Sequence, residues 1–338
     1  MRPVLRWLLM PLWLLQLMSG AKSFAANPLI GSAWLNRRGL HVWRTRLADR
    51  RAKARRRRFG ALVSAAQRDA FERDGFLVIE DLLPDADFEA LRAEVLATRQ
   101  PVVEHQEGDA LTRHLRLDPP VLTALPAVKR LLADPRWRRP LCYVAAFSVR
   151  PLLSVQSVFS QIEPANRDPQ NDLHIDSFYC SMKAWYYLDD VPADAGPLVY
   201  VPGSQRLTKR RLAWQRRKSI AACDPATENP EDRRGSFRID PAELARLRLS
   251  EPQRLAVKAN SLVVADTFGF HCRAVSDRPG RRVALYAMSR PNPFLPVCLD
   301  LSGLPGLLRR WRLLPGDRLR KRIASPADPP EALGSKLR

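Results

Sequence analysis

Two histidines and one aspartate have the types and spacing of a metal site. His174 and Asp176 are separated by one residue in LHIDSFY, a segment whose composition predicts a β-strand. Residues i and i+2 of a strand point to the same face, so the imidazole and the carboxylate can bind one ion while Ile175 points into packing. His271 follows at the end of NSLVVADTFGFH. Two histidines and one carboxylate leave three positions of an octahedral metal open, which is the non-haem Fe(II) arrangement. A strand histidine is also often a core residue, and the triplet alone leaves that alternative open.

The segments around these residues predict a mainly β fold. After residue 140 come short runs rich in branched and aromatic residues, separated by turn residues: YVAAFSV, SVQSVFSQI, LHIDSFY, MKAWYYLDDV, GPLVYVPGS, RLAVKANSLVVADTF and RRVALYAMS. Such a series is typical of a sandwich or barrel. Helices are predicted before it, from a capping box at Ser64 and from the spacing of Phe88, Leu91 and Val95. A basic and then acidic, helical segment at 206–250 interrupts the β series.

The order of these features resembles the phytanoyl-CoA dioxygenase family of Fe(II)/2-oxoglutarate-dependent oxygenases. The resemblance covers residues 64–295 and rests on FERDGFLVIEDLLPDADFEAL, the His-x-Asp triplet, WYYLDD, AGPLVYVPGS and FGFHCRAVSDRPGRRVAL, in this order. It implies a double-stranded β-helix (jelly-roll or cupin-like) core with flanking helices, and iron bound by His174, Asp176 and His271. It also implies 2-oxoglutarate as cosubstrate and O2 as oxidant. Because Asp176 is present, the halogenase variant, which leaves that coordination position vacant for a halide, is not expected.

The distal carboxylate of an iron-chelating 2-oxoglutarate needs a cation, and arginine supplies a bidentate partner. Arg281 and Arg282 both follow His271 at a suitable distance. As neighbours on a strand they face opposite sides, so only one can point into the barrel. The family spacing, two residues after Gly280, favours Arg282, and Arg281 is the alternative.

The resemblance places two further residues at the cosubstrate pocket. Trp185 matches a position that lines it, with core packing as the alternative, and Gln156 has a comparable position on the strand before the triplet. By strand alternation, Lys183 and Tyr187 share the face of Trp185 and are candidates for the same pocket. Arg273 stands where the family has a small hydroxyl residue, a departure that bears on the cosubstrate or substrate pocket.

Positive charge is concentrated in three segments. The 338 residues include 56 Lys and Arg against 35 Asp and Glu, a formal net charge of +21, and 37–58, 206–218 and 309–322 hold this excess. It suggests an anionic partner: nucleic acid, an acidic membrane surface or an anionic substrate. No nucleic-acid-binding motif accompanies the basic segments, which argues against nucleic acid. The 46% hydrophobic content excludes disordered and fibrous classes.

The N-terminus indicates membrane contact. Arg2 and Arg6 precede an apolar run over residues 7–18. As a helix this run rises only ~18 Å, short of the ~30 Å hydrocarbon core. We therefore expect it to lie in the membrane interface, with the basic segment 37–58 on anionic head groups. A cleaved signal peptide and a helix packed on the domain are the alternatives. Trp214, in the basic segment 206–218, is a candidate to insert into lipid.

These features divide the chain into a membrane-proximal region at 1–60, a dioxygenase domain at 61–300 with an insertion at 206–250, and a basic tail at 301–338. We expect a dioxygenase that hydroxylates an unactivated C–H bond of a membrane-associated anionic lipid or glycolipid. A soluble small-molecule hydroxylase of secondary metabolism and a non-catalytic scaffold tethered by basic arms are the alternatives. Five widely spaced cysteines indicate a reducing compartment. We expect a cytoplasmic protein, peripheral on the cytoplasmic membrane face.

Overall fold

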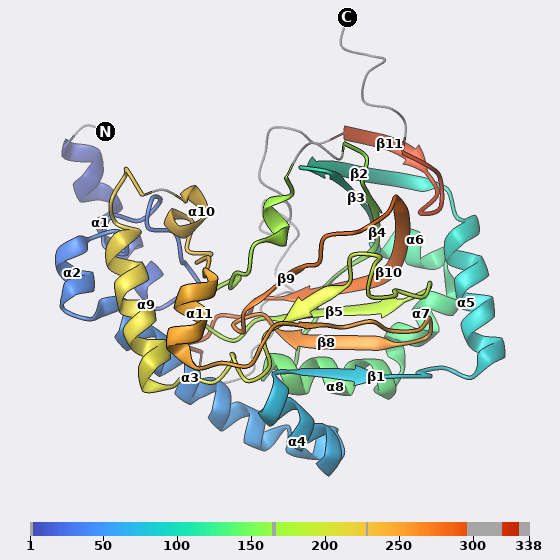
Figure 1. The fold of residues 1–338 in the computed structure, drawn as a ribbon, viewed down its shortest axis with the longest axis horizontal. Coiled ribbons are helices and arrows are strands. Elements are labelled where there is room, and N and C mark those ends of the chain that lie inside the picture. The colour runs from blue at the N-terminus through green and yellow to red at the C-terminus, as the bar shows by residue number, and fades with distance from the viewer. Residues whose placement is uncertain (1–2, 164–166, 228, 296–319, 331–338) are drawn as a thin grey trace, which may run out of the picture.

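The computed structural model describes residues 3–163, 167–227, 229–295 and 320–330, and in this part of the chain the strands form two antiparallel sheets (Figure 1). The large sheet has the order β1 (Phe76–Ile79), β8 (Leu262–Asp266), β5 (Met182–Tyr187), β10 (Gly280–Ser289), β4 (Leu152–Ser160), β3 (Ala110–Arg116), β2 (Gln100–Glu107) and β11 (Arg320–Ala324). The small sheet has the order β7 (Gln253–Arg254), β6 (Leu198–Tyr200) and β9 (His271–Arg273). Leu198 and Tyr200 of the small sheet share a hydrophobic cluster with Val263 and Ala265 of β8. The expected mainly β, double-stranded β-helix class is confirmed.

Helices flank the two sheets. In chain order they are α1 (Pro3–Leu17), α2 (Ala33–Arg37), α3 (Leu40–Arg58), α4 (Ala65–Asp74), α5 (Asp85–Ala97), α6 (Pro119–Thr123), α7 (Pro126–Ala133), α8 (Pro135–Ala145), α9 (Lys209–Ala221), α10 (Pro230–Arg233) and α11 (Pro241–Leu247), with short 3-10 turns at Gly60–Leu62 and Pro169–Asn171. The predicted capping box at Ser64 is present and begins α4. Of the tail at 301–338, residues 320–330 are described, and they add β11 beside β2; the rest of the basic segment 309–322 lies outside the described residues.

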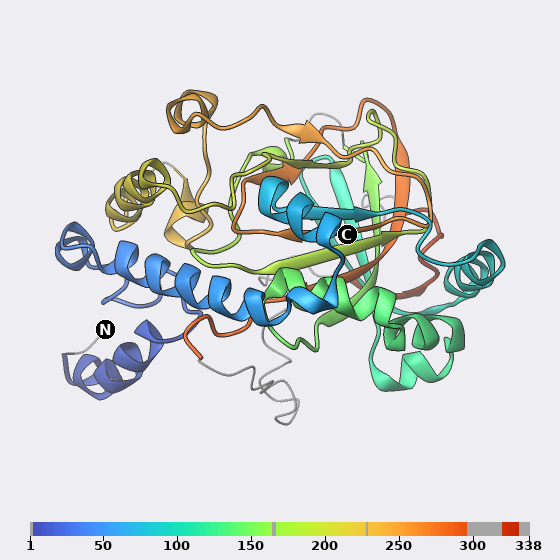
Figure 2. The same cartoon turned by 90° about the horizontal axis from the view of Figure 1, so that it is seen from below.

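Most of the basic segment 37–58 forms α3, which begins at Leu40 and runs along the body of the protein beside α8 (Figure 2). Three of its arginines are buried and donate hydrogen bonds to backbone carbonyls. Arg44 bonds to the carbonyls of three residues at positions 17–21, Arg55 to that of Ala146 at 2.9 Å, and Arg56 to that of Val144 at 3.0 Å. A guanidinium has five N–H donors, so each can satisfy several carbonyls at once. The expectation that the whole segment rests on lipid head groups is therefore wrong for these arginines.

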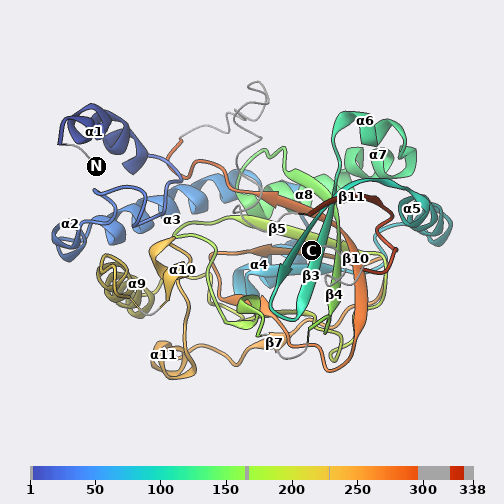
Figure 3. The ribbon, with the colours of Figure 1, turned by 90° about the horizontal axis from the view of Figure 1, so that it is seen from above.

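The N-terminal helices and the insertion at 206–250 gather at one end of the molecule, and α5, α6 and α7 lie at the other (Figure 3). The N-terminal segment and the insertion are joined: the backbone N–H groups of Phe24 and Ala25 donate to the carbonyl of Arg233 at 2.8 and 3.3 Å. Trp214 of α9 is fully buried, with its ring edge-on to Phe270. The expectation that Trp214 inserts into lipid is therefore wrong, because its indole already fills a core.

The helix α1 packs on the domain through one side only. Trp13 is buried and its carbonyl accepts a hydrogen bond from Asn27, whereas Leu8, Leu12 and Leu15 are exposed. None of the helices in the described part of the chain combines the length and hydrophobicity that a bilayer crossing needs. None of the four described cysteines is in a disulfide.

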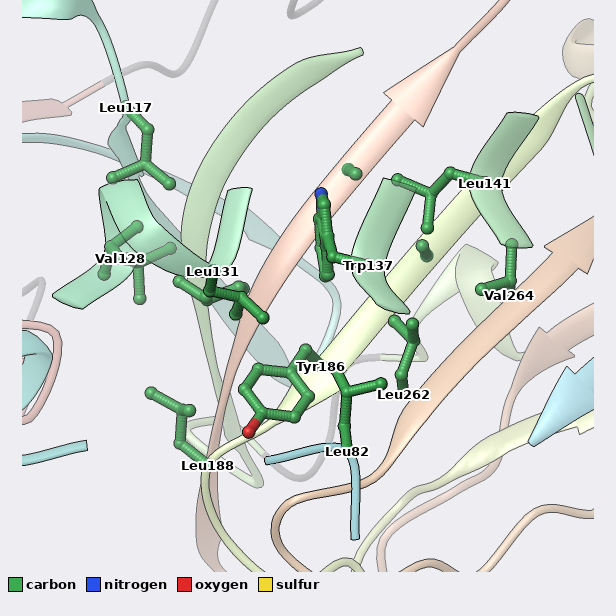
Figure 4. Close-up of a cluster of buried hydrophobic side chains, with 14 of the residues drawn as sticks. Leu82, Leu117, Val128, Leu131, Trp137, Leu141, Tyr186, Leu188, Leu262 and Val264 are labelled. Atoms are coloured by element: carbon green, nitrogen blue, oxygen red, sulfur yellow. The ribbon is translucent and has the colours of Figure 1, made fainter. Parts of the chain in front are cut away.

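The main hydrophobic core lies between the large sheet and α5, α7 and α8 (Figure 4). Trp137 of α8 packs there near Tyr186 of β5. Strand alternation sends Ala184 and Tyr186 into this core. Lys183 and Trp185, which alternate with them along β5, consequently face the other side of the sheet, where the cavity described next is found.

Candidate active site

A cavity of about 640 Å³ opens on the face of the large sheet opposite the main core. It contains every residue that the sequence analysis proposed for the metal site or the cosubstrate pocket: Gln156, His174, Asp176, Lys183, Trp185, Tyr187, His271 and Arg282. A second cavity, of about 410 Å³ beside α6 and α8, contains none of them.

The three proposed metal ligands meet at one place. The backbone N–H of His174 donates to the carbonyl of His271 and the reverse, both at 3.0 Å, so an isolated bridge, and not a regular strand, positions the triplet. Nε2 of His174 lies 3.9 Å from Oδ1 of Asp176, and Nε2 of His271 lies 3.9 Å from Oδ2. The ligand atoms lie within 4.8 Å of one another and all three side chains are buried. Ile175 points away and is fully buried in a separate cluster, as the alternation predicts.

The other ring nitrogen of each histidine is held by a backbone carbonyl. Nδ1 of His174 is 2.7 Å from the carbonyl oxygen of Asp172, and Nδ1 of His271 is 3.0 Å from that of Gly269. A ring nitrogen that donates to a carbonyl carries the proton, so Nε2 presents its lone pair to the space between the three side chains. Burial lowers the pKa of His271 to about 4, and burial together with nearby His271 lowers the pKa of His174 well below its ordinary value. Both rings are therefore neutral at pH 7, as metal ligands must be.

The carboxylate of Asp176 is surrounded by cations. Burial opposes its ionisation, but Lys183 and Arg290 outweigh burial and hold the pKa of Asp176 well below its usual range. Nζ of Lys183 lies 2.7 Å and a terminal nitrogen of Arg290 lies 3.4 Å from Oδ2. Nζ of Lys22 donates to the backbone carbonyl of Asp176 at 2.5 Å. Burial, and then the positive charge of Arg290, lower the pKa of Lys22 to about 7.

This donor set fits a divalent transition metal. Nε2 of His271 is buried and has no hydrogen-bond partner among the described residues. A buried nitrogen with a free lone pair carries a desolvation cost unless something binds it. Two neutral imidazoles and one ionised carboxylate match the ligands of mononuclear Fe(II) centres. His174, Asp176 and His271 would hold such an ion.

The two neighbouring arginines of β10 have opposite surroundings. Arg282 lines the cavity, and one terminal nitrogen, NH1, is buried without a hydrogen-bond partner among the described residues. Burial, and then the charge of Arg273, lower the pKa of Arg282 to about 10, so it remains a cation at pH 7. Arg281 points away, and its NH1 donates to the carbonyl of Ala327 at 2.9 Å. Arg282 is therefore the one placed to receive a carboxylate inside the cavity.

A model of the phytanoyl-CoA dioxygenase (PhyH) family matches residues 71–246. The chain belongs to this family. The matched part includes His174 and Asp176 and ends before His271 and Arg282, so the phytanoyl-CoA dioxygenase match and the geometry of the last two residues are independent observations.

The ectoine dioxygenases of Bordetella parapertussis and Bordetella bronchiseptica are each 30% identical to the chain over 171 residues, covering 44% of this chain and 52% of theirs. The chain spans about half the length of these curated relatives. The epimerase SnoN, solved with Fe3+, alpha ketoglutarate and nogalamycin RO, aligns with 17% identity and a TM-score of 0.43 over 78% of this chain and 98% of that chain. HygX from Streptomyces hygroscopicus, solved with nickel and 2-oxoglutarate, aligns with 17% identity and a TM-score of 0.41 over 68% and 87%.

Trp185 and Gln156 hydrogen-bond to each other in this phytanoyl-CoA dioxygenase family member. Nε1 of Trp185 donates to Oε1 of Gln156 at 3.2 Å. They lie on β5 and β4, which flank β10 on its two sides, and Tyr286 of β10 packs 5.8 Å from the Trp185 ring. The pair forms one wall of the cavity. The two residues were predicted separately, because the strand order that makes them neighbours cannot be read from the sequence of either strand.

Several cationic side chains that line the cavity were not predicted from the sequence. Arg290 directly follows β10, eight residues after Arg282, so alternation continued past the end of the strand could have indicated it. Lys22 and Arg238 gave no signal, because they come from the N-terminal segment and the insertion. The departure at Arg273 also lines the cavity, where its guanidinium is paired with Asp168 at 2.9 Å.

Proposed function

We propose that the chain is an Fe(II)- and 2-oxoglutarate-dependent dioxygenase that hydroxylates an unactivated C–H bond of a small molecule. One observation carries the proposal: a single cavity holds both the buried His174, Asp176 and His271 set and the unpartnered guanidinium nitrogen of Arg282. Membership of a dioxygenase family supports the reaction class. The curated relatives are named for ectoine, which supports a small-molecule substrate. The lipid or glycolipid substrate expected from the basic segments has no comparable support.

Each side chain has a defined part in this proposal. The histidines offer neutral Nε2 atoms and Asp176 offers a charged oxygen, so the site accepts a divalent ion without losing protons. When bound, iron and 2-oxoglutarate together supply the oxidising chemistry, with 2-oxoglutarate ending as succinate and carbon dioxide. Arg282 binds the distal carboxylate and orients it. The Trp185–Gln156 wall limits access of water to the cosubstrate.

Metal binding and turnover test the proposal together. Calorimetric titration with Ni(II) and succinate formation from 2-oxoglutarate under aerobic Fe(II) conditions, with a panel of small molecules that includes ectoine, are measured on the same preparation. His174→Ala is expected to abolish both signals. The matched control is His105→Gln, in the same cavity but hydrogen-bonded to Glu107 and outside the ligand set. Absence of Ni(II) binding by the unaltered protein, or equal loss in the control, would sink the proposal.

We propose, second, that α1 rests in the surface of an anionic bilayer. Leu8, Leu12 and Leu15 are 72%, 50% and 72% exposed, and their spacing of four and then three residues places them on one helix face. Arg37 and Arg38, at the end of α2, are exposed as well, which suits anionic lipid. Support comes from these residues alone.

Vesicle sedimentation tests this second proposal. The full chain is expected to sediment with vesicles containing anionic lipid, and the double change Leu8→Ser with Leu15→Ser is expected to leave it in the supernatant. Val275→Ser, which alters an exposed apolar residue elsewhere, is the control and should sediment as before. Equal sedimentation of all three proteins, or of none, contradicts the proposal.

A further inference from the structure

Four cationic side chains gather around Asp176. Besides Lys183 and Arg290, which contact its carboxylate, Lys22 reaches its backbone carbonyl, and Arg238 forms a backbone bridge with His174. The guanidinium of Arg238 donates to the carbonyl and the hydroxyl of the same serine, residue 236, at 2.9 and 3.0 Å. All four line the cavity.

The cavity holds too few carboxylates to balance these cations. Its lining carboxylates, among the described residues, are Glu107, Asp176 and Glu231. Glu107 is bonded to His105 at 3.0 Å and Glu231 is paired with Arg234. That leaves Asp176 to face four cations. Once Asp176 binds a divalent ion, its charge is engaged there. Glu231, which is paired with Arg234, also acts on Lys22, so among the described lining residues the cations still outnumber the opposite charges.

The distal carboxylate of the cosubstrate lies far from this group of cations. Arg282 lies on β10 and Arg290 directly follows the strand, eight residues later, which corresponds to about 26 Å between their Cα atoms at the rise of an extended chain. A 2-oxoglutarate whose distal carboxylate meets Arg282 therefore brings only its metal-chelating carboxylate near Asp176. One carboxylate does not balance four cations, so we expect a further anion in the cavity to supply the remaining negative charge.

We infer that the substrate carries an oxyanion, a phosphate or a carboxylate, and that Lys22, Arg238 and Arg290 bind it beside the metal site. The inference rests on the proposed function for the role of the bound molecule, and on the charges of the cavity for its chemistry. Arginine offers two parallel N–H donors to such a group, and lysine offers a point charge. The substrate class is thus an anionic small molecule, held at one end while its C–H bond faces the metal.

The three binding residues come from three separate parts of the chain that the fold fixes together. Lys22 belongs to the N-terminal segment, Arg238 to the insertion, and Arg290 directly follows β10. Gly235 adopts a φ of +81°, and a Cβ atom there would lie 2.3 Å from the carbonyl oxygen of Lys22. The insertion consequently approaches Lys22 closely enough that only glycine fits, and this contact sets the position of the lysine.

Calorimetric titration with inorganic phosphate and with acetate, at constant ionic strength, tests the inference. The protein is the full chain loaded with Ni(II) and 2-oxoglutarate, and the same titrations are repeated without metal. Lys22→Gln, Arg238→Gln and Arg290→Gln are each expected to weaken binding of the preferred anion about tenfold or more, because each removes a charge-assisted hydrogen bond. Arg234→Gln is the matched control, since this exposed arginine lines the same cavity but is paired with Glu231. It should change affinity less than about twofold.

Two readouts separate the possible failures. Anion binding that requires the metal but is unchanged by all three substitutions indicates direct coordination of the anion to the metal, and this result overturns the inference. An equal loss of anion affinity in Arg234→Gln overturns it as well. Lys22→Arg is expected to restore affinity, which excludes a general loss of folding as the cause. Ni(II) and 2-oxoglutarate binding are measured separately in every variant. Loss of those two signals in the unaltered protein contradicts the proposed function, whereas a missing anion signal alone contradicts only the oxyanion site.

Discussion

At the scale of single residues, two adjacent arginines show how far local rules reach. Arg282 lies in the cavity, where one of its nitrogens has no hydrogen-bond partner in the described part of the chain, whereas Arg281 bonds to the carbonyl of Ala327 on the other side of the sheet. Alternation along a strand depends only on the backbone, so sequence analysis could state that one of the two points inward. The family spacing favoured Arg282, and Arg282 lines the cavity.

The two arginines form a matched pair for a test of the cosubstrate site. Arg282→Gln is expected to raise the KM for 2-oxoglutarate by about ten- to a hundredfold, since a charge-assisted contact contributes roughly 1.5–3 kcal/mol. Arg281→Gln should leave KM within about twofold, because that side chain meets a loop on the outer surface. KM is measured from succinate formation, and calorimetric binding of 2-oxoglutarate to the Ni(II) protein checks the same order. Similar KM values for the two variants would contradict the assignment.

Other residues of the site lay beyond local rules. The hydrogen bond between Trp185 and Gln156 depends on β5 and β4 flanking β10, which neither segment encodes. Lys22 is separated by 154 positions from Asp176, whose carbonyl it meets. A contact of that range is decided by how the chain packs and leaves no trace in spacing or composition.

At the scale of elements, the basic helices α3 and α9 are structural parts of the protein. Nε2 of His41 on α3 is 2.7 Å from Oε1 of Gln215 on α9, and both residues are buried. The high charge density of each helix suggested a surface role, and that inference failed where arginines find backbone carbonyls, as Arg44 and Arg56 do. Composition counts charges, and it does not show which of them are satisfied inside.

The His41 contact predicts an acid-dependent loss of stability. Burial lowers the pKa of His41 to about 4, against the opposing effect of its hydrogen bond to the side-chain oxygen of Gln215, while an unfolded histidine titrates near pH 6.5. The unfolded chain therefore takes up the proton first, so this contribution to stability is complete above about pH 6.5 and is lost as the pH falls toward 4. At pH 4.5 the loss amounts to roughly 2.5 kcal/mol.

Urea unfolding at pH 7 and pH 4.5 measures this contribution. The free energy of unfolding is expected to fall less between the two pH values in His41→Gln than in the unaltered protein, because glutamine does not titrate. Comparing the two proteins removes the effect of other groups, such as His114, whose pKa burial also lowers to about 4. Equal pH dependence in the two proteins would contradict the prediction.

At the scale of the whole molecule, the N-terminal region is integral to the folded protein. Ala48 and Ala52 of α3 are buried, Arg55 bonds to the carbonyls of Pro293 and Leu295, and Lys22 reaches the metal site. Removal of this region would leave those carbonyls and the apolar surface beneath α3 exposed.

Two truncations test this integration. Deleting residues 1–59 is expected to give insoluble protein, or one whose melting temperature falls by more than about 10 °C, because several buried contacts are lost together. Deleting residues 1–12 should have a small effect, since Leu8 and Leu12 are exposed. Soluble yield and thermal unfolding by circular dichroism measure both. A stable, metal-binding product of the longer deletion would contradict this description.

The carbonyl contacts of Arg55 also bear on how the protein is made. Its partners Pro293 and Leu295 lie 238 and 240 positions later in the chain. Until the ribosome has synthesised those positions, α3 lacks these two contacts, although its partners at residues 144–146 have already emerged. Contacts of such long sequence separation form late and slowly. The contacts that hold α3 against residues 293–295 are therefore completed only when translation is nearly finished, and before that point we expect the nascent α3 to be a binding site for a chaperone.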